Sequence, residues 1–151
     1  MTADREPVAS GSVSEGWELF AHDADIGVRG RGSSPAAAFE NAARAMTAAI
    51  VAPSEVTLEE SVRIVCEAPD LELLLVDWLN ALVFEMATRG MLFGAFSVRI
   101  TGERLEAEAR GERVDRRRHG PAVEVKGATY TALKVARGED GIWTAQCIID
   151  V

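Results

Sequence analysis

The stretch that decides the fold is residues 69–90, PDLELLLVDWLNALVFEMATRG. Within it, apolar side chains recur at helical spacing and cover one broad face: Leu71, Leu74, Leu75, Trp78, Leu79, Leu82 and Met86. Leu73, Val76 and Phe84 extend this apolar character nearly all round the helix. A helix that is apolar on most of its circumference is buried on more than one side, so we predict a central helix with other elements packed around it.

Capping residues mark the ends of this helix and of another helix before it. Asp70 can accept hydrogen bonds from the free N–H groups of the first turn, and Gly90 can adopt the left-handed conformation that ends a helix. Ser34 followed by Pro35 is a helix start signal, and the helix that begins there must end before Pro53. One apolar stripe runs along it: Phe39, Ala42, Ala43, Met46, Ala49 and Ile50.

The rest of the chain alternates apolar and polar residues, which is typical of strands. We predict strands at residues 17–20, 26–30, 56–67, 96–100, 105–109, 123–136 and 142–151, the fourth and fifth forming a hairpin. Residues 116–121 are expected to be a loop. The predicted fold class is α+β: a single domain, residues 16–151, in which two helices pack on a mostly antiparallel sheet. Residues 1–15 show no periodicity and are expected to be a disordered N-terminal tail.

Length and composition limit the class of protein. A chain of 151 residues with 48% hydrophobic and 26% charged residues is typical of one globular domain and not of a disordered chain. Sixteen basic against 24 acidic residues give a net charge of −8, which disfavours direct high-affinity binding to nucleic acid. No apolar run approaches the roughly 20 residues that span a bilayer, and the N-terminus does not resemble a secretory signal. We therefore expect a cytoplasmic protein without a membrane partner.

The two cysteines, Cys66 and Cys147, are far apart, and each lies in an apolar, strand-like run. This pattern excludes a scaffold stapled by disulfides and a structural zinc site. We predict that both are buried, inert thiols.

Two acidic residues interrupt the first predicted strands in the segment His22-Asp23-Ala24-Asp25. Carboxylates at a strand end suit a cation that prefers oxygen ligands, such as calcium or magnesium. Two carboxylates are too few to complete such a site, so other ligands would have to come from elsewhere in the chain. The alternative is a turn closed by the two Asp side chains, with His22 at the surface.

The end of the last predicted strand is a second candidate. An ordered end would place the α-carboxylate of Val151 beside the side chain of Asp150, offering several oxygen ligands from adjacent residues. The alternative is a strand that simply stops there.

Three further groups of polar residues are candidates for recognition. Arg116–His119 is a basic run in an acidic protein, suited to a phosphate, to a partner's acidic patch, or to a solvated loop. Glu124 and Lys126 face the same side of a predicted strand, as a surface ion pair or as a recognition feature. Asp77 and Asn80 are expected on the solvent-facing side of the central helix. The sequence contains no phosphate-binding glycine loop, no nucleophile elbow and no zinc-protease motif.

Taken together, these segments resemble one family, archease. The matching stretches are HDADIG at 22–27, AFENAA at 38–43, LLLVDWLN at 73–80, GE at 111–112, His119, EVK at 124–126, ATY at 128–130 and IIDV at 148–151. The resemblance covers residues 17–151. The family's usual first pattern is His-Thr-Ala-Asp, so Asp23 replaces the Thr and adds a negative charge beside Asp25. The family also usually has Ala where this chain has Gly127.

The resemblance implies a protein cofactor and not an enzyme. Archeases assist the RtcB-type RNA ligase of tRNA splicing and RNA repair: they promote guanylylation of its active-site histidine from GTP, allow multiple turnover and can broaden its nucleotide choice. The resemblance also implies a divalent metal ion held by Asp25, Asp150 and Val151, with Asp23 as an additional candidate. Calcium is the first choice of metal, and magnesium, manganese and zinc are the alternatives.

Charged residues are implicated by the resemblance in activating the partner: Arg118, His119, Glu124 and Lys126. A second hypothesis is a chaperone or adaptor for RNA-modifying enzymes, in which the helix face and Arg116–Arg118 matter more than Asp25. A third, a metal-dependent hydrolase, has no base or nucleophile in the sequence to support it.

Overall fold

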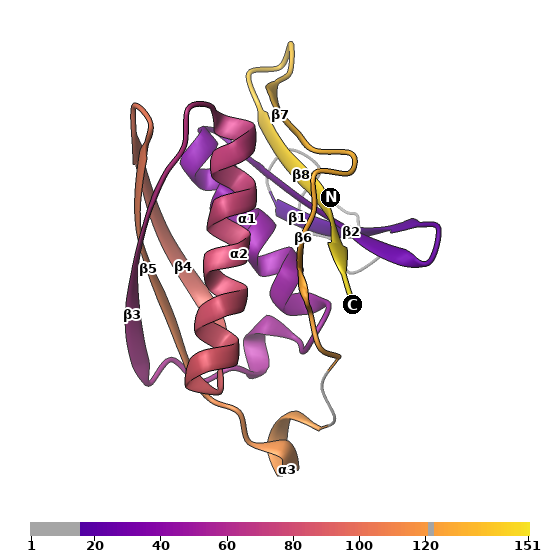
Figure 1. The fold of residues 1–151 in the computed structure, drawn as a ribbon, viewed down its shortest axis with the longest axis vertical. Coiled ribbons are helices and arrows are strands. Elements are labelled where there is room, and N and C mark those ends of the chain that lie inside the picture. The colour runs from indigo at the N-terminus through magenta and orange to yellow at the C-terminus, as the bar shows by residue number, and fades with distance from the viewer. Residues whose placement is uncertain (1–15, 121–122) are drawn as a thin grey trace.

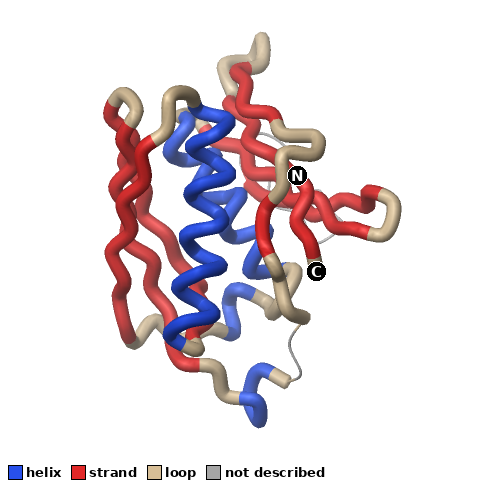
Figure 2. The backbone as a smooth tube through the Cα atoms, in the orientation of Figure 1, coloured by secondary structure: helices blue, strands red, loops and turns tan. Residues whose placement is uncertain are grey.

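The structure is a computed structural model that describes residues 16–120 and 123–151. Two antiparallel sheets enclose two long helices, so that the helices form the middle layer (Figures 1 and 2). In chain order the elements are β1 (Gly16–His22), β2 (Asp25–Gly32), α1 (Pro35–Ala48), the 3-10 turn η1 (Pro53–Glu55), β3 (Glu60–Glu67), α2 (Leu71–Arg89), β4 (Met91–Thr101), β5 (Arg104–Arg113), α3 (Arg116–His119), β6 (Gly127–Ala128), β7 (Lys134–Arg137) and β8 (Trp143–Asp150).

The first two and the last three strands in the chain form one sheet, and the three strands between them form the other. One sheet has the order β1-β2-β8-β6, with β7 also paired to β8, and the other has the order β3-β5-β4. Both α1 and α2 contact strands of both sheets. The α+β class and the antiparallel pairing are confirmed, but the predicted single sheet is in fact two. An α2 that is apolar nearly all round requires a layer on each side, which explains the second sheet.

The central helix begins and ends where its capping residues predict. The Asp70 carboxylate accepts the N–H of Leu73 at 2.8 Å, and Gly90 follows the last turn with φ 65°. Trp78 is completely buried, and its indole N–H donates to the carbonyl oxygen of Phe39 on α1 at 3.1 Å. The Trp78 ring also meets Phe96 of β4 edge-on, so this one side chain joins α1, α2 and the three-stranded sheet.

The first helix packs its backbone directly onto β2. Ser34 caps it by accepting the N–H of Ala37 at 3.1 Å, with Pro35 in the first turn as predicted. A Cβ atom on Gly30 would lie 2.2 Å from the backbone nitrogen of Ala42, so only glycine permits this approach.

Two predicted strands are wrong in extent. The strand predicted at 56–67 begins only at Glu60, because the N–H of Thr57 donates to the Glu112 side chain and not to a neighbouring strand. The long strand predicted at 123–136 is two short strands, β6 and β7. Between them Ala132 has φ 52°, which no strand residue adopts, and Thr129 donates its N–H to Ile148 of β8.

The predicted loop at 116–121 contains a helical turn, α3. Asp115 begins it, because its carboxylate accepts the N–H of Arg117 at 3.0 Å. Residues 121 and 122 lie outside the described part of the chain, as does the tail predicted at residues 1–15.

The thiol predictions hold fully for one cysteine. Cys147 is completely buried, whereas Cys66 is only half-buried, and both are free thiols. Burial raises the pKa of Cys147 to about 12 and, together with the nearby Asp77 carboxylate, the pKa of Cys66 to about 11. Neither is a reactive thiolate near neutral pH. Among the described residues, no helix has the length and apolar character that crossing a membrane requires.

Candidate functional site

The first acidic segment forms the tip of the hairpin between β1 and β2. His22 pairs with Asp25, and Asp23 and Ala24 form the two-residue turn between them. Asp23 adopts φ 52°, a conformation that Asp tolerates better than most residues. A turn is present here, but among the described residues neither Asp side chain accepts a hydrogen bond that would close it, as the alternative to a cation site required. The turn leaves Asp25 as the first residue of β2.

Strand register brings Asp25 next to Asp150. The antiparallel pairing of β2 with β8 includes Ile26 opposite Ile149, so the next step along the ladder sets Asp25 opposite Asp150. Val28 and Cys147, paired and buried, show which face of these strands meets the helices. Because side chains alternate along a strand, Asp25 and Asp150 share the opposite, outer face.

We call Asp25, Asp150 and Val151 the carboxylate edge. β6 borders it on the other side: Gly127 pairs with Asp150, and the N–H of Lys126 donates to the Asp150 carbonyl oxygen at 2.8 Å. Asp25 is half-buried, while Asp150 and Val151 are exposed, so the edge is open to solvent.

The donors at this edge are oxygens, which suit hard divalent cations. Over residues 16–120 and 123–151, no three or more His, Cys, Asp or Glu side chains converge as a ready metal cluster. Asp23 has a side chain that is 93% exposed, and its carboxylate lies 3.9 Å from Nδ1 of His22. Two carboxylates in register are too few to fill a coordination shell, so an ion held here would keep part of its water shell.

A network of charges holds together the three strands that carry the edge. Glu18 of β1 binds Arg29 at 3.0 Å and Arg31 at 2.6 Å, both from β2, and the Nε of Arg29 donates to Gln146 of β8 at 2.8 Å. Burial of Glu18 acts to raise the pKa of its carboxyl, but the hydrogen bonds and charges of the two arginines outweigh it and lower the pKa. Arg29 also lies 4.3 Å from the centre of the Phe20 ring.

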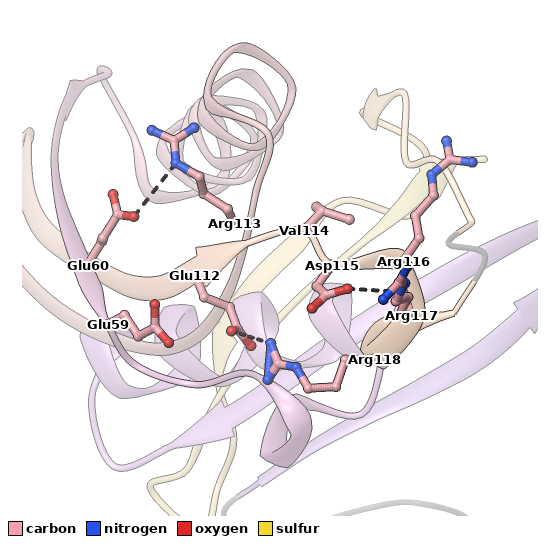
Figure 3. Close-up of a pocket in the computed structure, with 9 residues that line it drawn as sticks. All are labelled: Glu59, Glu60, Glu112, Arg113, Val114, Asp115, Arg116, Arg117 and Arg118. Carbon is pink, nitrogen blue, oxygen red and sulfur yellow. Dashed lines mark hydrogen bonds and ion pairs between the residues drawn. The ribbon is translucent and has the colours of Figure 1, made fainter.

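A second polar cluster surrounds Glu112 at the end of β5 (Figure 3). The Glu112 carboxylate accepts the backbone N–H of Thr57 at 2.7 Å, contacts His119 Nε2 at 3.0 Å, and forms an ion pair with Arg118. Glu112 is only 4% exposed and the His119 side chain only 1%. The cluster thus ties α3 to the segment that leads into β3.

An open cleft of about 740 Å³, which we call the α3 cleft, lies over this cluster. Four arginines and four acidic residues line it, together with Val114: Glu59, Glu60, Glu112, Arg113, Asp115, Arg116, Arg117 and Arg118 (Figure 3). Equal numbers of each sign make it a mixed surface and not a strongly basic one.

His119 has no nitrogen free for proton transfer. Its Nδ1 accepts the N–H of Asp115 at 2.9 Å, so in the neutral ring Nε2 carries the hydrogen and donates to Glu112. The hydrogen bond from Thr57 lowers the pKa of the Glu112 carboxyl, aided by His119 and the Arg118 charge and opposed by burial. This arrangement suits a structural role, in which Glu112 and His119 hold α3 against the rest of the fold, better than a role in acid–base catalysis.

The structure separates the predicted partner residues from one another. Arg118 and His119 belong to α3 at the lower end of Figure 1, and residues 123–126 lead from there to β6 beside the C-terminus. Glu124 and Lys126 are exposed on either side of buried Val125, and these two described residues form no ion pair with each other.

One residue expected at the solvent is bound within the fold. Asn80 is half-buried and bonds the backbone of Ala128 through both atoms of its amide, whereas Asp77 is exposed as predicted. The sequence contained one indication of this contact. Asn80 is a polar residue between Leu79 and Leu82 on a helix that is apolar nearly all round, so its side chain needs a hydrogen-bond partner once that helix is buried.

Residues 17–151 match the Archease protein family (MTH1598/TM1083). The chain is similar to the protein archease of Pyrococcus abyssi, with 39% identity over 139 residues that cover 89% of this chain and 98% of the relative. It is also similar to the protein archease of Methanopyrus kandleri, with 38% identity over 89% of this chain and 99% of the relative.

Known structures agree in fold. The solution structure of protein 1598 of Methanobacterium thermoautotrophicum has a TM-score of 0.79 and 34% identity, over 90% of this chain and 99% of that one. The crystal structure of an archease of Thermotoga maritima has a TM-score of 0.60 at 20% identity, over 100% of both chains, and supports the fold alone. A family match over all the described elements except the first residue of β1, with several relatives above 30% identity, shows that this chain belongs to the archease family.

Proposed function

We propose that this protein is an activating cofactor of an RtcB-type RNA ligase, and that the carboxylate edge is where it holds a divalent cation. The observation that carries the proposal is the register of β2 and β8, which sets Asp25 beside Asp150 on one outer face. These are two of the positions that the family resemblance implies for the metal. The resemblance also supplies the identity of the partner.

The oxygens of Asp25, Asp150 and Val151 would hold the ion, with Asp23 at the hairpin tip as a further candidate. A divalent cation at a nucleotidyl-transfer site neutralises charge that develops on the triphosphate. The exposure of Asp150 and Val151 leaves the edge accessible to the mouth of a partner's active site. Calcium fits the oxygen donors, as do magnesium and manganese; zinc would also call for a nitrogen donor such as His22, which pairs with Asp25 in the β1–β2 hairpin.

The α3 cleft and the exposed residues before β6 are the candidate contacts to the ligase. Arg118 is held in place by Glu112, and Glu124 and Lys126 face solvent between α3 and the carboxylate edge. Charged groups in such positions govern the orientation and rate of docking more than its affinity. The protein itself would then carry no catalytic residue.

The test is RNA ligation under multiple turnover by a purified RtcB-type ligase, with GTP and a divalent metal, in the presence and absence of this protein. Stimulation that disappears in Asp25→Asn and Asp150→Asn but survives in Asp77→Asn, a control on the exposed side of α2, supports the proposal. A one-residue or longer extension after Val151 should also abolish stimulation. Full stimulation by Asp25→Asn would contradict the metal role.

A chaperone or adaptor for RNA-modifying enzymes is the second candidate. The Thermotoga maritima relative is described as a possible chaperone. The mixed charges of the α3 cleft favour a protein contact there. This function predicts that Arg116→Ala and Arg117→Ala abolish assistance to a client enzyme while Asp25→Asn does not, the reverse of the pattern above.

A further inference from the structure

Asn80 joins the central helix to the strand that borders the carboxylate edge. Its Oδ1 accepts the N–H of Ala128 at 2.8 Å, and its Nδ2 donates to the Ala128 carbonyl oxygen at 3.3 Å. One side-chain amide thereby satisfies both backbone groups of one residue of β6. Ala128 is opposite Ile149 in the sheet, so β6 is held between α2 and the end of β8.

β6 in turn holds the main chain at the carboxylate edge. The N–H of Lys126 donates to the carbonyl oxygen of Asp150 at 2.8 Å, and Gly127 is the residue opposite Asp150. β6 is two residues long, which gives it few ladder hydrogen bonds of its own. Thr129, the next residue, adds two bonds to β8, because its N–H and its hydroxyl both donate to the Ile148 carbonyl oxygen at 2.9 Å. Asn80 adds the side-chain attachment of β6 to α2.

We propose that Asn80 is a positioning residue for the carboxylate edge: by anchoring β6 to α2, it fixes the main chain of Asp150 and with it the cation ligands. Asn80 touches no ion itself, and the inference rests on the proposed function only where it concerns cation binding. Outer residues that orient ligands typically change metal affinity by about 10- to 100-fold when they are replaced.

The experiment uses Asn80→Leu, which keeps the number and branching of the side-chain heavy atoms but makes neither hydrogen bond, and Asn80→Ala. Asp77→Ala, exposed one turn earlier on the same helix, is the matched control. The first readout is hydrogen exchange of the Lys126 amide in metal-free protein. The second is calcium affinity by calorimetry. The amide of Val98, which donates to Glu40 at 2.8 Å in the other half of the molecule, reports on the general fold.

We expect exchange at Lys126 to become about tenfold faster or more in both Asn80 variants, with Val98 unchanged, and calcium affinity to fall about tenfold or more. The control should match the unsubstituted protein in both readouts. Unchanged exchange at Lys126 would overturn the proposal, as would equal acceleration at Val98, which would make Asn80 a residue of the general fold. Unaltered calcium affinity would overturn it too. If the unsubstituted protein binds no calcium, the metal role fails separately, and the exchange rates still decide the role of Asn80.

Discussion

Asp25 and Asp150 are cross-strand neighbours at the end of the β2–β8 ladder, one residue beyond the pair of Ile26 and Ile149. Like charges at opposed positions on one face of a sheet destabilise it, because the two carboxylates repel each other. Without a metal, we therefore expect the two carboxylates to lower the stability of this solvent-open edge. The divalent cation proposed above would reverse the sign of that interaction if it were bound between the two carboxylates.

Removing one of these charges should therefore stabilise the metal-free protein and abolish its response to metal. For Asp150→Asn we expect a gain of about 0.5 kcal/mol in the free energy of unfolding without metal. Calcium at a hundredfold its Kd should stabilise the unsubstituted protein by about 2.7 kcal/mol and the variant by nothing measurable. Urea unfolding with calcium and with chelator measures both, and equal stabilisation of the two proteins by calcium would contradict the assignment.

The hydrogen bonds and the ion pair of Glu112 should make the free energy of unfolding depend on pH in the acid range. Its folded-state pKa is lowered, so the stabilisation is present above the ordinary Glu value of about 4.3 and is lost as the pH falls through the lower folded-state pKa. Glu112→Gln replaces one acceptor oxygen with a donor that faces Arg118 or His119, so this variant should be less stable at neutral pH.

Urea midpoints measured from pH 7 to pH 3 test this expectation. The midpoints of Glu112→Gln and the unsubstituted protein should converge as the pH falls, because both then carry an uncharged side chain at this position. Glu124→Gln, an exposed control, should follow the unsubstituted curve. A constant difference between Glu112→Gln and the unsubstituted protein across that range would show that the carboxylate charge plays no part.

Gly30→Ala should be among the most damaging single substitutions in the fold. The added Cβ would lie 2.2 Å from Ala42 N and 2.3 Å from Ala38 O, which are backbone atoms that cannot move alone. We expect a loss of about 3 kcal/mol or more, at the upper end for overpacking. Gly127→Ala is the control, because its Cβ would meet only the Asn80 side-chain oxygen, at 3.1 Å. Thermal unfolding compares the two, and an equal loss in both would contradict close packing of α1 on β2.

Neither cysteine should react with a thiol reagent in the native state near pH 8. The pKa values of about 11 for Cys66 and about 12 for Cys147 leave almost no thiolate there, and Cys147 is completely buried. Both should react at once in denaturant, which serves as the control for reagent quality. Rapid labelling of the native protein at Cys147 would indicate frequent opening of β8.

Local signals in the sequence predicted those parts of the fold that depend on neighbouring residues. Asp70, Gly90 and Ser34 cap helices because their partners lie within a few positions along the chain. The strand predicted at 123–136 was wrong because Ala132 takes a left-handed conformation that no nearby residue signals. Likewise, the division of the strands into two sheets follows from packing around α2.

In the candidate site, too, the sequence did not predict contacts between residues that are far apart along the chain. Each of Asp25 and Asp150 was singled out from its own surroundings, but nothing in either segment says that they are neighbours. The family resemblance implied a shared metal, and the pairing of β2 with β8 supplies the geometry. Asn80 was assigned to the solvent side because its partner, Ala128, lies 48 residues away. Whether a metal binds the edge stays a prediction.

Crystals grown with manganese, with anomalous scattering measured at the manganese edge, test the central assignment most directly. We expect one strong peak between β2 and β8, within about 2.6 Å of carboxylate oxygens of both Asp25 and Asp150, and no such peak in crystals of Asp25→Asn. A strong peak elsewhere on the molecule, or an edge that stays empty while its two carboxylates point apart, would contradict it.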